Sequence, residues 1–349
     1  MVKFSVAPKH ADSLREICNG LACSEGKLVH LGVQRAPNKS TLAYANQHRP
    51  AALFEDLFYT SLNRFRGQQG LGTRKSKFRF KNKLLSLDST TISLCLELYP
   101  WAKYRRAKGG VKAHVLLDHD DYLPSYVLIT EAKQSDVRVA QSLDLNAGSI
   151  VAMDRGYNDY ALFGKWTGQG VFFVTRLKEK AIYEVTESII GPLPRNIVSD
   201  ETIRLTGPKA IKDCPHLLRR VVVWDERNQR EIDLLTNQHQ FGPTTIAAIY
   251  KDRWEIELFF KALKQNLKVK SFVGTSKNAL LIQIWTALIA IMLLKWLHHL
   301  SKAKWSLSNL ASMLRLNLFT YRNLLLWLDN PFGTPPLIPV PVQFSLELN

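Results

Sequence analysis

The sequence predicts an α/β fold that is interrupted by a mainly β block and flanked by helical regions. Strand, hairpin, strand and helix patterns follow one another between residues 83 and 167, and five strand-like runs crowd into residues 171–237. Helical periodicity dominates before residue 66 and after residue 243. With 349 residues, the chain is long enough for two or three packed sub-domains.

The N-terminal region, residues 1–66, is expected to be helical. Ser40 can cap one helix and Pro50 can open the next. Apolar residues then recur at i, i+3, i+4 spacing, at Leu53, Phe54, Leu57, Phe58, Leu62 and Phe65. Residues 67–83 form a linker that we expect to be basic and loosely structured, because lysines, arginines and glycines occur there without an acid.

The strands of the α/β core begin after this linker. Residues 83–93 are rich in apolar and β-branched residues, and residues 112–130 predict a hairpin with acidic residues and a proline at its turn. Residues 149–154 form a third short strand, followed by a helix from Asp159 to about Thr167. Residues 84–170 are thus the first part of the core, and residues 171–240 are the β-rich block.

Helices return near the C-terminal end. Pro243 opens a predicted helix from Thr244 to about Lys268, so residues 241–275 are assigned to a core helix. Two more helices are expected at about 278–300 and 307–328, within a C-terminal region of residues 276–349. Its proline-rich end predicts extended, polyproline-like backbone.

The charge balance points to a polyanionic partner. Lys and Arg exceed Asp and Glu by 47 − 30 = +17, which makes nucleic acid the first candidate. The apolar stretch 280–294 is interrupted by Gln283 and Thr286, so we expect a buried helix and no membrane partner. The cysteines lack zinc-ligand spacing and favour a reducing cytosol; they are Cys18, Cys23, Cys95 and Cys214.

One helical stripe carries an acid among cations. At ~100° per residue, Tyr250, Arg253, Glu257 and Lys264 fall at about 0°, 300°, 340° and 320°. A neighbouring apolar face would dock this helix on a core. The plainer interpretation is a solvated face with ion pairs that contribute only tenths of a kcal/mol.

Two aspartates at predicted strand ends favour a catalytic role for this helix over a solvated face. Asp88 lies in or at the end of one predicted strand, and Asp154 ends another. Either alone would be interpreted as a turn or cap carboxylate. Together with Glu257 they can converge on two divalent ions, Mg²⁺ or Mn²⁺, because hard oxygen ligands favour these metals. Such ions, ~3.5–4 Å apart, support in-line displacement at phosphorus, with Arg253, Lys264 and the Tyr250 hydroxyl on the flanking phosphates.

These residues also carry a family resemblance. The spacing Tyr250-x2-Arg253-x3-Glu257-x6-Lys264 resembles the YREK signature of bacterial DDE transposases of the insertion-sequence-four family. The segment LDSTTI around Asp88 resembles the first acidic block of that family, and MDRGYNDY around Asp154 resembles the second. The β-rich stretch after residue 171 resembles the insertion that precedes the family's glutamate, and the resemblance spans about residues 30 to 300.

The resemblance implies an RNase H-like catalytic core, a DNA-binding N-terminal region and a Mg²⁺-dependent enzyme that cuts and rejoins DNA. By their match to the two acidic blocks and the signature, Asp88, Asp154 and Glu257 would be the catalytic metal ligands, while Tyr250, Arg253 and Lys264 would contact DNA. The partners would be terminal inverted repeats and target DNA, bound by a homodimer that pairs two ends in the bacterial cytoplasm at the nucleoid. The N-terminal region is shorter than we expect for relatives.

Two alternatives stay open from the sequence. One is a nuclease of the same fold without strand transfer, and the other is a transposase-derived DNA-binding regulator that has lost catalysis. Away from the acids, residues 118–121 are interpreted as solvated turn residues rather than a metal site. Trp166 and Trp224 are expected to pack in a core.

Overall fold

A computed structural model describes residues 13–24, 26–72, 77–105, 108–189, 191–266, 272–317, 320 and 322–334. The chain divides into two compact units. We name them the sheet unit, residues 72–262, and the helical unit, residues 1–71 and 263–349. Each is described by itself.

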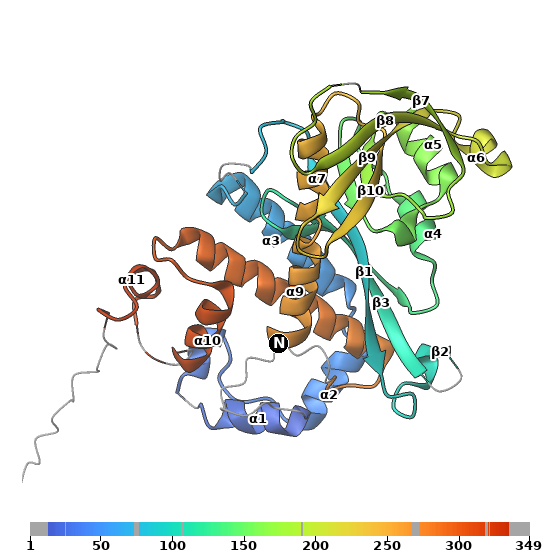
Figure 1. Ribbon diagram of the computed structural model, residues 1–349. Helices are drawn as coiled ribbons and strands as arrows, with labels where there is room; N and C mark the ends of the chain where they lie inside the picture. Colours follow the sequence, from blue (N-terminus) through green and yellow to red (C-terminus); the bar gives the residue numbers. More distant parts are fainter. Residues whose placement is uncertain are drawn as a thin grey trace, which may run out of the picture. The chain divides into compact units, whose positions relative to one another are not determined.

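The sheet unit is built on one mixed sheet, which has ten strands within the described residues. Its order is β2-β3-β1-β5-β6-β10-β9-β8-β7, with β4 paired to β3 (Figure 1). The strands are β1 (Leu84–Leu94), β2 (Lys103–Arg105), β3 (Lys108–Asp118), β4 (Leu123–Glu131), β5 (Ile150–Met153), β6 (Phe172–Arg176), β7 (Tyr183–Ser188), β8 (Ile197–Leu205), β9 (Leu217–Asp225) and β10 (Arg230–Thr236).

The first strands confirm the predicted strand, hairpin and strand. β1 runs antiparallel to β3, and β3 runs antiparallel to β4 across the turn at residues 119–122. β1 is parallel to β5, with Leu87 opposite Met153, and β5 is parallel to β6. The carboxyl ends of β1, β5 and β6 therefore approach the same edge of this part of the sheet.

The five strand-like runs of the predicted β block correspond to β6–β10, so their existence is confirmed. The block is continuous with the core sheet, because β10 pairs with β6 and the order continues through β9, β8 and β7. Backbone hydrogen bonds thus extend one sheet across the boundary expected at residue 171.

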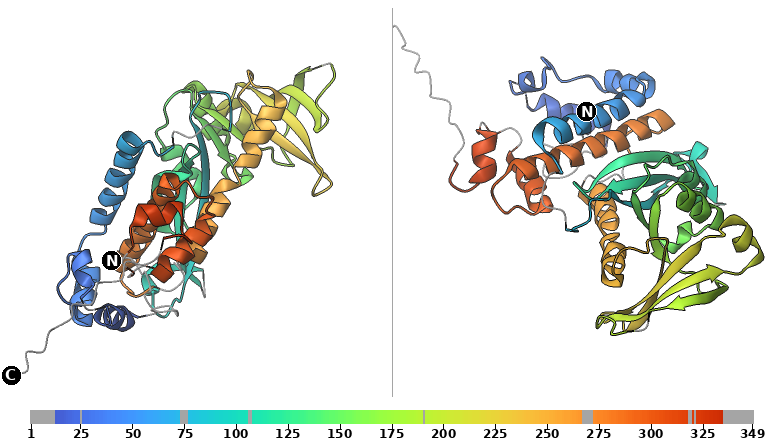
Figure 2. Two further views of the ribbon diagram at one scale, coloured as in Figure 1. Left: turned by 90° about the vertical axis from the view of Figure 1, so that its left-hand side faces the viewer. Right: turned by 90° about the horizontal axis from the view of Figure 1, so that it is seen from above.

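Alternation along β1 and β5 sends successive side chains to opposite faces of the sheet. Leu85, Leu87, Val151 and Met153 pack in a core with helices α4 (Asp136–Ser142), α5 (Tyr160–Gly168) and α6 (Pro208–Asp213). Leu84 and its neighbours on the other face pack against α7 (Pro243–Asp252). The helices therefore cover both faces, as the ribbon views show (Figure 1; Figure 2).

The two tryptophans differ in environment. Trp166 of α5 is fully buried, which confirms its predicted place in a core. Trp224 of β9 is 37% exposed, so the core prediction is wrong for that residue.

The helical unit contains the predicted helices, with changed boundaries. They are α1 (Leu14–Ala22), α2 (Lys39–His48), α3 (Ala52–Gln69), α9 (Lys277–Leu300), α10 (Leu307–Asn317) and α11 (Leu324–Asp329), with a 3-10 turn at Leu28–Leu31. Ser40 lies inside α2, whose N-cap is Asn38, so the predicted cap is wrong. The helix expected over 307–328 is two helices.

α9 is the central apolar helix of this unit. Among the described residues it alone is long and apolar enough to cross a membrane by length and composition, and 67% of its most apolar window is buried in the fold. It packs against α3, where Trp285 contacts Phe58 and Tyr59. The prediction of a buried helix is confirmed. Residues 335–349 of the proline-rich end, and residues 73–76 of the basic linker, lie outside the described residues.

Candidate active site

The strand register places the two predicted aspartates side by side. Leu87 and Met153 are direct neighbours on the parallel strands β1 and β5. Asp88 and Asp154, one residue further along each strand, therefore occupy adjacent positions where β5 ends. Aspartate is a poor strand former, yet Asp88 lies inside β1 with its side chain only 16% exposed.

Asp154 has a local role as well. It is the N-cap of the 3-10 turn Arg155–Tyr157, and its Oδ1 accepts a hydrogen bond from the Arg155 backbone N–H at 2.6 Å. Asp88 accepts a similar bond from the Ser89 backbone N–H at 2.7 Å. Backbone donors thus orient one oxygen of each carboxylate.

The predicted long helix is broken near the glutamate, which corrects the assignment of residues 244–268 to a single helix. α7 ends at Asp252, α8 spans Glu255–Lys261, and a π-helical turn covers Ala262–Asn266. The Glu257 backbone N–H bonds to the Trp254 carbonyl, three residues back rather than four. The tightened segment and the wider π turn change the angles between the side chains from Tyr250 to Lys264. The ideal rotation of ~100° per residue therefore does not describe their arrangement.

Arg253 lies between two of the acids. Its Nη1 is 3.4 Å from Asp88 Oδ2 and 3.6 Å from Glu257 Oε1. Its guanidinium carbon stands 5.7 Å from the ring centre of Tyr250. The buried Nε of this arginine has no hydrogen-bond partner within the described part of the chain. One cation therefore touches both carboxylates and retains donor capacity.

The electrostatics of Asp88 join the three acids into one site. Burial raises the pKa of Asp88 to about 7; the Ser89 hydrogen bond and the charge of Arg253 lower it, while Glu257 and Asp154 raise it. Glu257 and Asp154 are thus close enough to Asp88 for their negative charges to oppose its ionisation, while the positive charge of Arg253 favours it.

The donor set fits Mg²⁺ or Mn²⁺ in its chemistry. The ligands are carboxylate oxygens, which these hard ions prefer, with neither thiol nor imidazole among them. Within the described residues, no group of three or more His, Cys, Asp or Glu side chains has the spacing to hold an ion.

Five of the six predicted site residues belong to the sheet unit, and electrostatic or direct contacts join them. They are Asp88, Asp154, Tyr250, Arg253 and Glu257. The sixth, Lys264, lies in the π turn within the helical unit. Its place beside the other five stays a prediction.

Comparison with known proteins decides the family. The model of the transposase DDE domain matches residues 79–293. The chain belongs to the DDE transposase family. It is 34% identical over 267 residues to y4zB of Sinorhizobium fredii, which carries the name of a transposase; the match covers 74% of this chain and 71% of that protein. It is 33% identical to a transposase named for insertion sequence element IS5377 of Geobacillus stearothermophilus, over 68% of this chain and 62% of that protein.

The insertion-sequence-four type is supported by a further relative. Transposase InsG of insertion sequence element IS4, from Escherichia coli, is 27% identical over half of this chain and 42% of its own length. The resemblance based on the signature residues is therefore confirmed at the level of the family.

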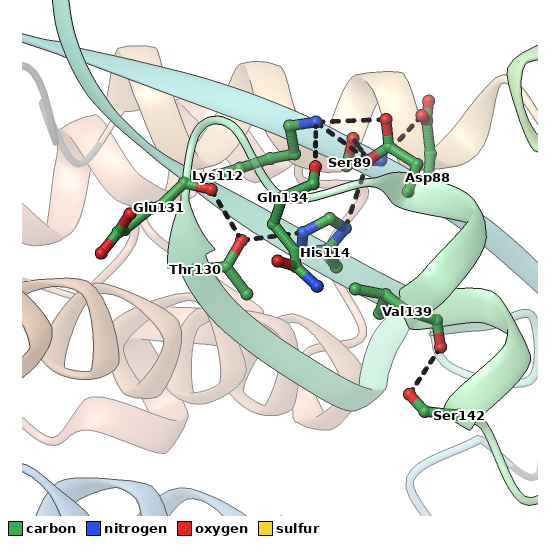
Figure 3. Close-up of polar contacts among 10 residues, drawn as sticks. Asp88, Ser89, Lys112, His114, Thr130, Glu131, Gln134, Val139 and Ser142 are labelled. Atoms are coloured by element: carbon green, nitrogen blue, oxygen red, sulfur yellow. Dashed lines mark hydrogen bonds and ion pairs between the residues drawn. The ribbon is translucent and has the colours of Figure 1, made fainter. Parts of the chain in front are cut away.

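A polar cluster behind Asp88 of this DDE domain was not predicted (Figure 3). The Ser89 hydroxyl donates to Asp136 Oδ1 at 2.7 Å, and Lys112 Nζ lies 3.2 Å from Asp136 Oδ2. His114, fully buried, has its Nδ1 3.3 Å from Asp136 Oδ1. The cluster holds the residue next to Asp88 from the face opposite Arg253. Its sequence signal is the alternation of Lys112 and His114 in an otherwise apolar strand, which puts both on one face.

A further cation belongs to the same neighbourhood. Burial raises the pKa of Tyr250, Arg253 lowers it, Asp154 raises it and Arg176 lowers it, so Arg176 lies near the Tyr250 hydroxyl. Arg176 ends β6, the third parallel strand. The convergence of parallel strand ends could have indicated it from the sequence.

The β3–β4 turn corrects the expectation for residues 118–121. Asp120 is exposed, as predicted, but Asp118 is 1% exposed and pairs with Lys83 at 2.7 Å. His119 is also buried, with its side chain 5% exposed. The prediction of solvated turn residues is wrong for these two, because the turn folds back on β1, where the His119 N–H bonds to the Leu84 carbonyl at 3.1 Å.

Proposed function

We propose that this protein is a transposase that cleaves DNA at the terminal inverted repeats of its element and transfers the freed strands into target DNA, in a cut-and-paste reaction. The observation that supports the proposal is the arrangement of three carboxylates from separate segments. Asp88 and Asp154 follow the paired residues Leu87 and Met153 of β1 and β5, and Arg253 contacts both Asp88 and Glu257. Family membership supports the same chemistry.

Asp88, Asp154 and Glu257 would hold two divalent ions, Mg²⁺ or Mn²⁺. When bound, such ions stabilise the attacking and leaving oxygens of in-line displacement at phosphorus. One oxygen of Asp88 accepts from the Ser89 backbone N–H and one oxygen of Asp154 accepts from the Arg155 backbone N–H, which orients the other oxygen of each. The mixed sheet with parallel β1, β5 and β6 supports an RNase H-like core.

The cations beside the acids would bind the DNA backbone. Arg253 exchanges its carboxylate contacts for phosphate oxygens when the ions neutralise the acids, and its unused Nε supplies a further donor. Tyr250 lies beside Arg253, and Arg176 lies near Tyr250; both would donate to the same or a neighbouring phosphate. Lys264 completes the predicted signature. Such contacts position the duplex without reading its sequence.

The protein would act as a homodimer that brings two element ends together, in the bacterial cytoplasm at the nucleoid. The net charge of +17 supports binding to long DNA. The activity and partners of the whole protein are inferred from relatives of which the chain covers 71% and 62%.

The test uses duplexes cut from the DNA that flanks the gene, with purified protein and Mg²⁺. We expect nicking at an inverted repeat and a joined product when target DNA is added. Asp88→Asn and Glu257→Gln should abolish both products while DNA retention in a gel shift changes less than about threefold. Glu255→Gln, on the same helix, is the matched control and should cleave normally.

The outcomes separate the alternatives. Nicking without a joined product would favour the nuclease. Sequence-specific binding without metal-dependent nicking on any end would favour the inactive regulator. Full-rate cleavage by Asp88→Asn would refute the assignment of the acids.

A further inference from the structure

Three buried polar side chains form a continuous link across the sheet unit. The Ser86 hydroxyl lies 2.7 Å from His119 Nε2, and His119 Nδ1 lies 2.8 Å from Asp252 Oδ2. Ser86 is 0% exposed, and the side chains of His119 and Asp252 are 5% and 3% exposed. The three residues come from β1, the β3–β4 turn and the last residue of α7.

The two ends of this link adjoin the acid site. Ser86 precedes Asp88 by two residues in β1, so both side chains leave the same face of the strand. Asp252 immediately precedes Arg253, at the break between α7 and α8. The link therefore joins the strand that carries one acid to the helix break that presents Arg253 and Glu257.

The imidazole is fixed at both nitrogens. With the proton on Nδ1, His119 donates to Asp252 and its Nε2 accepts from the Ser86 hydroxyl, so neither nitrogen is left unsatisfied. The backbone of His119 is held as well, by its N–H bond to the Leu84 carbonyl at 3.1 Å. The ring thus has one orientation, set by the strand and by the helix.

Asp252 is held as an anion inside the fold. Burial opposes its ionisation, but hydrogen bonds from His119 and Lys77 outweigh burial and lower its pKa. The Tyr122 hydroxyl lies 3.5 Å from the same carboxylate. A buried carboxylate bound in this way resists displacement, because moving it would leave an unpaired charge in the interior.

A serine, a histidine and an aspartate in this order also match the geometry of a hydrolase nucleophile. That function does not apply here. Ser86 has no exposed surface and lies in the central part of the sheet, between β3 and β5, so a substrate cannot reach its hydroxyl.

We propose that His119 is a positioning residue that sets the distance between the Asp88 strand and the Arg253–Glu257 helix, and thereby the spacing of the carboxylates that share divalent ions. This inference rests on the proposed function. His119 touches neither the ions nor the DNA; it acts through Ser86 and Asp252. Residues that support metal ligands typically change metal affinity by ~10–100-fold when they are removed.

The test measures Mn²⁺ binding to the intact protein, by electron paramagnetic resonance of the free ion, alongside the Mg²⁺ dependence of cleavage. We expect His119→Ala to weaken Mn²⁺ binding by about tenfold or more. Ser86→Ala, which removes only one hydroxyl, should weaken it by a few-fold and keeps the inference testable if the histidine variant does not fold. The double variant should be no worse than His119→Ala, because both changes cut the same link.

Asn237→Ala is the matched control for general destabilisation. Asn237 is 8% exposed and bonds to the Phe173 N–H at 2.9 Å and the Val171 carbonyl at 2.9 Å, at the other end of β6. It should lower the melting temperature without changing Mn²⁺ affinity. Cleavage by His119→Ala should recover at high Mg²⁺, whereas cleavage by Asp88→Asn should not.

Two results overturn the inference, and they are distinguishable from failure of the proposed function. If Ser86→Ala and His119→Ala bind Mn²⁺ as the wild type does, or if Asn237→Ala weakens binding equally, His119 has no positioning role while the function stands. If the wild type itself binds no Mn²⁺, both the function and the inference fail.

Discussion

Replacing Asp88 by asparagine should stabilise the metal-free protein, although it destroys the proposed ion site. The pKa of about 7 instead of the ordinary 3.8 corresponds to about 4 kcal/mol, at about 1.4 kcal/mol for each factor of ten in the ionisation constant. Asparagine removes that cost. The asparagine can keep the hydrogen bond from the Ser89 N–H, but its amide N–H then faces the Arg253 guanidinium. Two opposed donors destabilise the folded variant by about 1–2 kcal/mol. We expect a net gain of about 2 kcal/mol at pH 7.5.

The sign of the pH dependence follows from the same value. Because the folded pKa of Asp88 lies above 3.8, the folded protein binds more protons than the unfolded chain between about pH 4 and 7, and its stability falls as the pH rises. The advantage of Asp88→Asn should therefore be complete above pH 7 and vanish near about pH 5, where the ionisation cost of Asp88 equals the cost of the opposed donors. At about pH 4 only the cost of the opposed donors remains, so the variant should be slightly less stable than the wild type, which serves as the internal control.

The assay is thermal unfolding in a chelator at several pH values, repeated with Mn²⁺. The variant should melt several degrees above the wild type at pH 7.5, since ~1 kcal/mol moves the midpoint of a domain of this size by about 2–4 °C. Mn²⁺ should stabilise the wild type and leave the variant unchanged. A variant that melts below the wild type in the chelator, or that gains as much from Mn²⁺, would refute this reasoning.

Three further changes test the packing of the sheet unit. Arg219→Met should lower the free energy of unfolding in urea by about 3–5 kcal/mol, because Asp200, paired to it at 2.6 Å with 1% of its side chain exposed, loses its cation. In the double variant Arg219→Met, Asp200→Leu, most of the lost free energy of unfolding should be restored. A loss in the double variant equal to the sum of the two single-variant losses would contradict this prediction. Gly164→Ala should lower the melting temperature by several degrees, since its Cβ would meet the Asp213 carbonyl at 2.1 Å; an unchanged midpoint would count against the α5–α6 contact. Burial opposes ionisation of Asp136, but its hydrogen-bonding neighbours outweigh burial and hold its pKa well below 3.8. Its stabilisation is therefore present at neutral pH and lost as the pH falls below about 4, so Asp136→Asn should flatten the acid side of the stability profile, and an unaltered profile would exclude this role.

The local patterns predicted most of the sheet and the separate acids. Apolar and β-branched content predicted β1, the turn residues predicted the hairpin of β3 and β4, and short strand-like runs predicted β5 to β10. These signals are local, so one chain segment is enough to read them. That β10 pairs with β6, and so joins the β block to the core, is a long-range pairing that no single segment encodes.

The site shows the same division. Asp154 could be placed at the end of a strand and Asp88 in or at the end of another, and Asp88 in fact lies inside β1; their adjacency depended on the register of β1 and β5. The break after Asp252 was missed because neither glycine nor proline marks it, and the cause is tertiary. Asp252 is anchored to His119, which was itself misjudged as a solvated turn residue, since its burial depends on the turn folding onto β1.

The central claim is that Asp88, Asp154 and Glu257 share divalent ions. Anomalous diffraction from crystals of the protein with its inverted-repeat DNA and Mn²⁺ locates such ions directly. The account predicts two peaks ~3.5–4 Å apart that are bound by Asp88, Asp154 and Glu257, with Arg253 turned toward a phosphate. Peaks bound elsewhere, or an Arg253 still paired to Asp88 and Glu257 while DNA is bound, would contradict it.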